Sequence, residues 1–363
     1  MKKSILIKLS LCLLICINFS AFSQINVPDI SQKAKVMQRV GTTDIAIKYS
    51  RPTVNGREIW GTIVPYGMNN LGFGTATEAP WRAGADENTI IYFSHDVKVE
   101  GNPVKAGKYG FHVEVKPDNK ATIILSHDKD SWGSFFYDES KDALRAEITT
   151  NSVPHRELLT YEFNTVTPNS AIVSLVWEKK EIPFKIEVDV TKIVLDEFRE
   201  KAKGKLGFNR QNWEQAATFA LNNGGDLNEA LAWVDKAIEG QFFSQKTFNN
   251  LTLKGRILYK MGKTEESKKY INEAASMANM NQLNNLGYQL LNEKDYDLAL
   301  KFFKKNVADN PTNANVHDSL GECYKIMGDK KNAIKYLKKS LSLNPPANVK
   351  ANSEKLLKEL GVM

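Results

Sequence analysis

One pattern of residues occurs twice between Met280 and Pro345, and its two copies lie 34 residues apart. The matching pairs are Leu286-Gly287 and Leu320-Gly321, Ala299 and Ala333, the segments 301–305 and 335–339, and Asn310-Pro311 and Asn344-Pro345. A unit of this length forms a helical hairpin that cannot bury its apolar face alone, so neighbouring units must stack to share a core. The repeat therefore predicts an all-α solenoid, which offers a binding surface rather than a set of catalytic groups.

The period, with Leu-Gly early, Ala at the middle and Pro at the end, resembles the tetratricopeptide repeat. Residues 280–313 and 314–347 are the two clear units. A 3.6-residue apolar period before them indicates two more degenerate units. We therefore expect four hairpins over residues 209–347 and a capping helix over residues 348–363. The resemblance implies a scaffold that mediates protein–protein interaction.

The first helices of such hairpins line the concave groove of the stack. In the two clear units the candidate groove residues are Asn281, Asn284, Asn285, Tyr288, Asn315, Asp318, Ser319 and Glu322. The Lys and Arg residues that clamp a terminal carboxylate in the chaperone-binding members of the repeat family are absent from these positions. The expected ligand is therefore an internal segment of a protein partner, or the acidic N-terminal domain of the same chain.

From Lys33 to Val190 the apolar period is two, which is typical of β-strands with one buried face. Short apolar runs are separated by Gly, Pro, Asn and Asp, and a turn is expected at residues 178–181. The pattern contains no helical crossovers of the kind that a parallel sheet requires. Residues 24–190 are therefore predicted to form an antiparallel all-β sandwich or jelly roll, with residues 191–208 as a charged linker to the helical repeats.

Several sequence blocks in this β-region resemble a family of exported bacterial proteins known as domain of unknown function 2911. The blocks are Ser50-Arg51-Pro52, the segments 56–61, 64–67, 81–89 and 106–110, Trp132-Gly133, and the segments 137–142 and 177–179. The resemblance implies an envelope β-domain and no assigned activity. One departure is the insertion of Met68 to Pro80, where the family pattern runs almost directly from Val-Pro-Tyr-Gly into Trp-Arg.

An aromatic and charged cluster in the same region is the candidate ligand site of the β-domain. Its members are Arg51, Arg57, Trp60, Trp81, Arg82, Asp86 and Glu87. Trp and Arg on irregular backbone give a flat apolar surface with directed donors, which suits a sugar ring or a peptide carboxylate. The alternative is structural: the Arg side chains pair with Asp86 or Glu87, and the Trp rings cover one end of the sandwich.

Other chemistry is less favoured by the sequence. Ser94-His95-Asp96 and Ser126-His127-Asp128 contain the residue types of a hydrolytic triad, but adjacent residues on a strand point to opposite faces. A metal site from His95, His112 and His127 requires three strands to bring them together, since no pair shows ligand spacing on one element. We expect no metal, no cofactor and no catalytic residues.

The N-terminus carries three Lys and then an apolar run from Leu9 to Phe19, which is typical of a secretory signal peptide cleaved after Ser23. No transmembrane span is expected after its removal. The formal net charge of +7 is uneven, because residues 24–198 hold 20 basic and 24 acidic residues and residues 199–363 hold 26 and 18. We interpret the basic residues of the second half as solvated residues on the outer faces of the helices. The alternative is that they bind acidic partners or anionic polymers.

The sequence as a whole predicts an exported protein of the periplasm or cell surface of a Gram-negative bacterium. We expect a helical scaffold that binds a protein partner and presents a β-sandwich of unknown specificity, without enzyme activity. The alternative is a β-domain that binds or hydrolyses a glycan, with the repeats as its tether. Nucleic acid is not an expected partner, because the chain is predicted to be exported and contains no nucleic-acid recognition motif.

Overall fold

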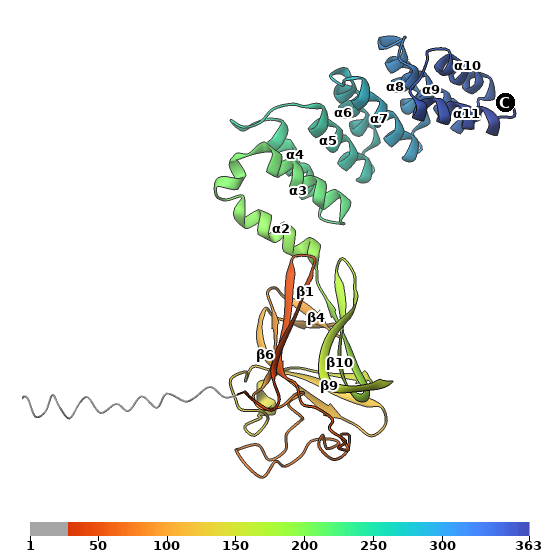
Figure 1. Cartoon of the computed structure of the whole chain (residues 1–363). Coiled ribbons are helices and arrows are strands. Elements are labelled where there is room, and N and C mark those ends of the chain that lie inside the picture. The colour runs from red at the N-terminus through yellow and green to blue at the C-terminus, as the bar shows by residue number, and fades with distance from the viewer. Residues whose placement is uncertain (1–27, 363) are drawn as a thin grey trace, which may run out of the picture. The chain divides into compact units, whose positions relative to one another are not determined.

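The protein is described by a computed structural model in which residues 28–362 are placed. The chain divides into two compact units, one ending at Val190 and one beginning at Thr191 (Figure 1). The predicted signal peptide, residues 1–23, lies outside the described residues. No helix within residues 28–362 has the length and apolar character needed to cross a membrane.

The first unit contains two antiparallel sheets. The six-stranded sheet has the order β1-β2-β3-β6-β7-β8, and the four-stranded sheet has the order β5-β4-β10-β9. The strands are β1 (Lys33–Val40), β2 (Thr43–Ser50), β3 (Thr89–Phe93), β4 (Val97–Val99), β5 (Asn102–Val104), β6 (Gly107–Val115), β7 (Lys120–Ser126), β8 (Asp142–Thr149), β9 (Asn151–Val166) and β10 (Ser170–Glu187). The prediction of an antiparallel all-β domain is confirmed.

Aromatic side chains from the two sheets meet in the core. Phe111 of β6 stacks on Phe184 of β10 with ring centroids 5.2 Å apart, and Tyr49 of β2 meets the edge of Tyr161 of β9 at 4.6 Å. All four side chains are buried. Side chains at alternate positions of each strand therefore fill the space between the sheets, as the period of two requires for a sandwich.

The expected turn at residues 178–181 is instead part of a continuous strand, β10. Its pairing with β9 shifts register between Val176 and Glu178, where Glu178 has a positive φ of 53°. A β-bulge therefore accommodates the charged residues that suggested a turn. The register shift between Val176 and Glu178 spans Trp177, which is fully buried.

The second unit consists of helices that pair as hairpins, which confirms the predicted all-α solenoid. The hairpins are α3 (Arg210–Asn222) with α4 (Leu227–Ile238), α5 (Phe248–Lys260) with α6 (Thr264–Ser276), α7 (Met280–Asn292) with α8 (Tyr296–Asp309), and α9 (Ala314–Ile326) with α10 (Lys330–Leu341), followed by α11 (Ala347–Glu359). Side-chain oxygens cap many helix starts; Asn279, for example, accepts from the backbone N–H of Gln282.

In three of the four hairpins a glycine lets the two helices approach closely. A Cβ added at Gly287 of α7 would lie 2.6 Å from the ring of Phe303 on α8, and one at Gly321 of α9 would lie 2.7 Å from Leu337 on α10. In α5 and α6 the same relation joins Gly255 to Ile271. The repeating pattern is therefore a packing requirement of the hairpin, because only a residue without a Cβ fits at this crossing.

The predicted linker, residues 191–208, is largely helical and packs against the first hairpin. It contains α2 (Val190–Lys201) and a short 3-10 helix, η2 (Lys205–Phe208). Leu195 is buried, and Phe198 meets the rings of Trp213 and Trp233 at centroid distances of 5.2 and 5.0 Å. Leu195 and Phe198 are three residues apart and share one face of the helix, so a narrow apolar stripe accounts for the packing despite the high charge.

Candidate functional site

The long irregular segment between β2 and β3 borders a cavity of about 360 Å³ in the β-unit. Among its lining residues are Arg57, Trp81, Arg82 and Asp86 from this segment, and Ser134 and Trp177 from elsewhere in the chain. Trp81 is held in place by two backbone hydrogen bonds with Val113 of β6, at 3.0 and 2.8 Å. The segment is therefore anchored to the sheet at the point where the charged residues begin.

Three Trp rings pack against one another beside the cavity. Trp81 stacks on Trp177 with centroids 6.0 Å apart, and Trp60 presents its edge to both rings. The indole Nε1 of Trp81 donates to the carbonyl of Gly84, whereas the buried Nε1 atoms of Trp60 and Trp177 have no hydrogen-bond partner within residues 28–362. The rings thus form a structural cluster that leaves indole donors unpaired, one of them on a cavity-lining residue.

Arg82 and Asp86 both line the cavity but do not form an ion pair with each other. The Arg82 guanidinium donates to the backbone carbonyl of Asp86 at 2.6 Å and lies 5.0 Å from the centroid of the Phe135 ring. The carboxylate oxygen Oδ2 of Asp86 is buried without a partner in the described part of the chain. Burial lowers the pKa of Arg82 and raises the pKa of Asp86, because each charge is removed from water.

The other predicted members of the cluster serve the fold. Arg51 donates to the carbonyl of Leu159 at 2.9 Å and to Thr160, which ties the segment to β9. Arg57 donates to the carbonyls of Thr53 and Val54 within its own loop. Glu87 pairs with Lys33 at 2.6 Å, and it is not among the residues that line the cavity. Arg57, Trp81, Arg82 and Asp86 therefore line one cavity, whereas Glu87 lies outside it and pairs with Lys33.

The inserted loop, residues 68–80, closes on itself and forms part of the cavity wall. A pair of hydrogen bonds between Asn69 and Ala79 joins its two ends, at 3.0 and 2.9 Å. At its tip the ring of Phe73 meets Phe135 at 5.5 Å, next to the Arg82 guanidinium. Asn69 and Leu71 line the cavity. The insertion thus contributes directly to the shape of the candidate site.

Sequence reasoning missed a buried pair at the cavity wall. His112 of β6 lies with its Nδ1 atom 3.1 Å from the hydroxyl of Ser134, and both residues are buried. Burial lowers the pKa of His112 to about 4, with the positive charge of Arg82 as the next cause, so the imidazole is neutral near pH 7. Ser134 directly follows the block Trp132-Gly133, which was the only available sequence signal.

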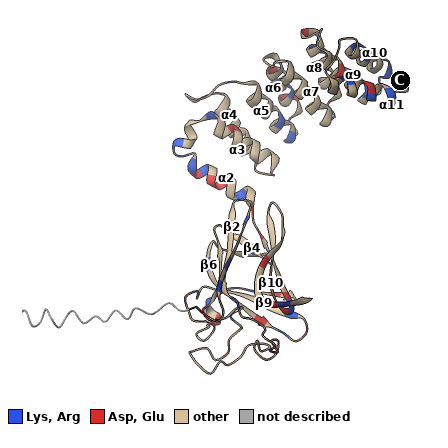
Figure 2. Ribbon diagram, viewed as in Figure 1, with Lys and Arg blue, Asp and Glu red and all other residues tan. Residues whose placement is uncertain are grey.

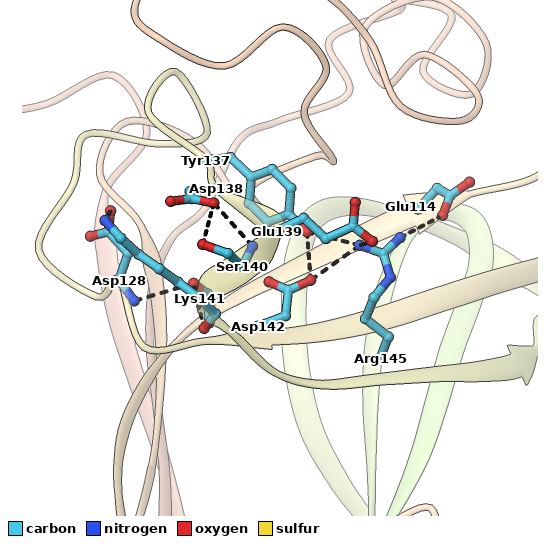
Figure 3. A network of polar contacts seen from close by, with 10 residues as sticks. Glu114, Asp128, Tyr137, Asp138, Glu139, Ser140, Lys141, Asp142 and Arg145 are labelled. Carbon is cyan, nitrogen blue, oxygen red and sulfur yellow. Dashed lines mark hydrogen bonds and ion pairs between the residues drawn. The ribbon is translucent and has the colours of Figure 1, made fainter.

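A second network of polar contacts involves residues that follow Ser134 in the sequence, and it holds a turn to the sheet (Figure 3). Tyr137 donates to Asp142 at 2.6 Å, and Arg145 of β8 donates to both side chains and pairs with Glu114 of β6. Burial raises the pKa of Asp142. The network fixes the short 3-10 helix η1 (Glu139–Lys141) against β8, and we assign it a structural role.

The two Ser-His-Asp triplets form local turn contacts. Ser94 accepts from the backbone N–H of Asp44 and lies 3.0 Å from His95, and Asp96 accepts from the backbone N–H of Ala106. Ser126 accepts from the backbone N–H of Asp128. Within residues 28–362 no group of three or more His, Cys, Asp or Glu side chains could hold a metal ion.

The predicted groove residues of the repeats divide into two sets. Tyr288 donates to Glu322 at 2.9 Å, and Asp318 accepts from Asn352 at 2.9 Å and from Ser353, so these side chains join one hairpin to the next element. Asp318 and Ser319 are buried. Asn281 and Asn285 are exposed, and Asn284, Tyr288, Asn315 and Glu322 are half-buried. Asn281 and Asn285 are therefore the candidates that are open to a partner.

A hollow of about 360 Å³ lies between the first helices of the first two hairpins, α3 and α5. It is lined by Gln211, Glu214, Gln215, Thr218, Phe248, Asn249, Thr252, Leu253 and Arg256. The hydroxyl of Thr252 is buried without a partner in the described chain. The hollow therefore lies on the two degenerate hairpins, whereas the predicted groove residues all lie on the last two hairpins.

Charge in the second unit is mixed. Lys192 and Arg199 pair with Asp196, Arg199 also pairs with Glu229, and Lys201 pairs with Glu197. Figure 2 shows basic and acidic residues alternating along α2. Pairing of this kind is typical of a solvated helix face.

The structure thus defines a β-sandwich protein that continues into a solenoid of helical hairpins. Residues 31–186 match the model of a family described as protein of unknown function (DUF2911). Residues 249–279 and 314–346 match the tetratricopeptide repeat model. The chain is therefore a DUF2911 domain followed by tetratricopeptide repeats, and both predicted resemblances are confirmed. The hairpin α7–α8 is not among the matched residues, although Gly287 and Phe303 give it the same internal packing.

Several solved structures are similar to the second unit. YrrB, described as a TPR protein with an unusual peptide-binding site, is 17% identical, with 46% of this chain and 84% of that chain covered and a TM-score of 0.31. MamA is 15% identical, with coverages of 43% and 89% and a TM-score of 0.32. The C-terminal part of a TPR repeat-containing protein from Cytophaga hutchinsonii is 16% identical, with coverages of 43% and 60% and a TM-score of 0.33.

All three TM-scores are below 0.5, so the repeat assignment rests on the family model and on the helix packing. The search of curated proteins found no match to this sequence.

Proposed function

We propose that this chain is an exported, non-enzymatic scaffold protein whose repeats bind an extended segment of a protein partner. The observation that carries the proposal is the hollow between α3 and α5, on the side of the hairpins formed by their first helices. Repeats of this class stack to form an extended concave surface, which is the part that binds partners. The DUF2911 domain is presented by the same chain.

The chemistry of the hollow suits a peptide backbone. Gln211, Gln215 and Asn249 are exposed and carry amides, each of which can both donate and accept a hydrogen bond. The unpaired hydroxyl of Thr252 adds a buried polar group, and Arg256 adds a cation. A peptide segment that carries an acidic side chain satisfies this set, because backbone N–H and C=O groups match the amides and a carboxylate matches Arg256.

The amide surface continues onto α7. Asn281 and Asn285 are exposed and lie four residues apart, one helical turn from each other. They occupy the first helix of the third hairpin, as Gln215 and Asn249 occupy those of the first two. The proposed ligand is therefore long enough to cross several hairpins, and an internal segment of a folded or unfolded partner fits better than a chain terminus.

Export is part of the proposal and rests on the sequence of residues 1–23. Three Lys followed by an apolar run and small residues before Gln24 are typical of a cleaved secretory signal. The mature protein then begins at Gln24 and functions in the periplasm or at the cell surface of a Gram-negative bacterium. Cys323 is the remaining cysteine of the mature sequence and is buried, in keeping with an oxidising compartment.

A glycan-binding or glycan-hydrolysing role for the DUF2911 domain has weaker support. Trp60, Trp81 and Trp177 turn their rings toward one another, so protein atoms occupy much of the aromatic surface that a sugar ring requires. Hydrolysis by the usual pair of carboxylates needs two acids facing a cleft. Among the cavity-lining residues Asp86 is the single acid.

The test is co-purification from the native envelope with a variant that blocks the groove. Asn249→Arg places a long cation at the second position of α5, in the hollow. Asn228→Arg is the matched control, because Asn228 is exposed and is the second residue of α4, as Asn249 is of α5, so each substitution places the same cation near the N-terminus of its helix. Mass spectrometry identifies what each tagged protein retains.

We expect the wild-type chain and Asn228→Arg to retain the same partner and Asn249→Arg to lose it. A chain that ends at Val190, the last residue of the first unit, should lose the partner as well. Equal retention by Asn249→Arg, or retention by the chain ending at Val190, would contradict the proposal.

A further inference from the structure

Two opposite charges in the cavity of the DUF2911 domain, Arg82 and Asp86, do not neutralise each other through direct contact. The third charged residue of the lining, Arg57, donates to the carbonyls of Thr53 and Val54 in its own loop. The Arg82 guanidinium forms one hydrogen bond, to the backbone carbonyl of Asp86, and no ion pair with any residue of the described chain. A guanidinium has five N–H donors, so most of the Arg82 donors stay unused by the protein. An Arg in partly buried surroundings is normally matched by a carboxylate, which makes Arg82 a ready site for one.

Asp86 is an acceptor that lacks a donor in the described chain. Its Oδ2 atom is buried without a hydrogen-bond partner in residues 28–362, and burial raises the pKa of the carboxyl group. Its neighbour Glu87 pairs with Lys33 at 2.6 Å, so the nearby Lys is already committed to another acid. A buried carboxylate oxygen without a partner is costly, and a cationic donor from a ligand would remove that cost.

A third residue that lines the same cavity, Trp177, also has a polar atom that is unpaired in the described part of the chain. Trp177 is 1% exposed, and its indole Nε1 has no partner within the described residues. An indole N–H can only donate, so it favours an acceptor such as a carboxylate oxygen. The remaining wall includes the apolar side chains of Ile63, Leu71 and Pro80. The cavity therefore offers donors, one acid and an apolar surface.

We propose that this cavity binds a small zwitterion with an apolar side chain, of the class of free amino acids and dipeptides. The ligand carboxylate accepts from Arg82 and the Trp177 indole, its ammonium group donates to Asp86, and its side chain lies against the apolar wall. The cavity volume of about 360 Å³ is of the size that small-molecule sites have, on the order of 300–1,000 Å³.

Other ligand classes leave part of the site unmatched. A simple anion would pair with Arg82 and bring a second negative charge to Asp86, and a simple cation would do the reverse. A sugar carries hydroxyl groups around its whole ring and needs polar partners on every side. Much of the lining is apolar, including Ile63, Leu71 and Pro80. A zwitterion satisfies both charges at once and leaves the net charge of the cavity unchanged.

The test is isothermal titration calorimetry on the full mature chain with defined probes. L-leucine and L-leucyl-L-leucine carry both charges. N-acetyl-L-leucine lacks the ammonium group, L-leucinamide lacks the carboxylate, and methyl glucoside represents neutral sugars. We expect at least one of the two zwitterions to bind, and each blocked leucine to bind at least about tenfold more weakly than its parent, the factor that one lost charge-assisted hydrogen bond gives.

Two variants and a matched control locate the site. Arg82→Gln and Asp86→Asn should each weaken binding of the zwitterion by at least about tenfold. Glu87→Gln is the control, because Glu87 adjoins Asp86 in sequence but pairs with Lys33 and does not line the cavity, so its binding should match wild type. Circular dichroism spectra that match wild type would show that each variant is folded.

The proposal is overturned if neither zwitterion gives saturable binding at millimolar concentration. It is also overturned if the blocked leucines bind as tightly as leucine, if methyl glucoside is the only probe that binds, or if Glu87→Gln weakens binding as much as Asp86→Asn. If the Arg82 variant misfolds, the proposal is still tested, because N-acetyl-L-leucine and L-leucinamide probe the same contacts on the wild-type protein. Binding of a zwitterion by the DUF2911 domain does not depend on the proposed role of the repeats.

Discussion

At the scale of single residues, the buried His112 connects the candidate site to the stability of the β-unit. Its Nδ1 atom contacts Ser134, which lines the cavity, and Arg82 and Asp128 are the charges that act on it. Burial places its pKa at about 4, below the ordinary value of 6.5. The folded protein therefore resists protonation of a side chain that the unfolded chain protonates readily.

The direction of the resulting pH dependence follows from proton uptake. Between pH 6.5 and about 4 the unfolded state binds a proton at His112 and the folded state does not, so stability falls as the pH falls. The contribution is complete above pH 6.5, and its full loss corresponds to on the order of 3 kcal/mol. His112→Asn keeps a polar group near Ser134 and removes the titration.

Urea denaturation of wild type and His112→Asn at several pH values measures this effect. We expect the wild-type free energy of unfolding to fall more steeply between about pH 7 and pH 4, by on the order of 3 kcal/mol relative to the variant. Carboxylates such as Asp142 titrate in both proteins and cancel in the comparison. Parallel curves would show that His112 is not buried as described.

Sequence patterns could not reveal the His112–Ser134 pair. The two residues are 22 positions apart, and their contact depends on the position of the 127–141 segment relative to β6. The cluster around Trp81 and Arg82 was predicted because its residues are adjacent in the sequence. Trp177 joins it only through the fold, because β10 brings the residue beside the segment between β2 and β3.

At the scale of elements, packing within the last three hairpins depends on one glycine per pair of helices. Gly287→Ala would bring a Cβ to 2.6 Å from the Phe303 ring, so the ring or the helix must move. Overpacking of this kind costs about 1–3 kcal/mol, against a gain of about 1 kcal/mol in helix propensity. We therefore expect Gly287→Ala to lower the free energy of unfolding or leave it nearly unchanged, although a Gly→Ala change in an exposed helix would raise it.

A double-mutant cycle with Phe303→Leu separates the two effects, because a smaller partner makes room for the added methyl group. We expect the double variant to be more stable than the sum of the single changes by about 1 kcal/mol or more, measured by chemical denaturation. Simple additivity would mean that Gly287 and Phe303 do not share the crossing.

The elements also show where periodicity succeeds and where it fails. The 34-residue repeat predicted the hairpins because the same Gly and apolar partner recur in them, as at Gly321 and Leu337. The segment 191–208 was read as a linker because its charges hide an apolar stripe at Leu195 and Phe198. Charges at 178–181 suggested a turn, but a bulge at Glu178 lets β10 continue.

At the scale of the whole molecule, the two units carry different proposals. The repeats are proposed to recruit a protein segment, and the DUF2911 domain to bind a small zwitterion. Neither depends on the other, so each can fail alone. Export belongs to the proposal for the whole chain, and it rests on residues 1–23.

Export gives a direct prediction about the N-terminus of the natural protein. Cleavage after Ser23 leaves Gln24 as the first residue. Intact-mass analysis of the protein from the periplasm or the outer envelope should find a chain that lacks residues 1–23. A chain in the cytoplasm that keeps the leader would contradict export.

The central claim is that the concave face of the repeats contacts a partner in the cell. Site-specific photo-crosslinking tests it most directly, with a photoreactive amino acid placed at Gln215 in the hollow of the first two hairpins or at Asn285 on α7. The matched control is Asn228, which is exposed on the second helix of the first hairpin. We predict that one protein is crosslinked from Gln215 and Asn285 and not from Asn228. Equal crosslinking from all three positions, or from Asn228 alone, would contradict the assignment of the groove as the binding surface.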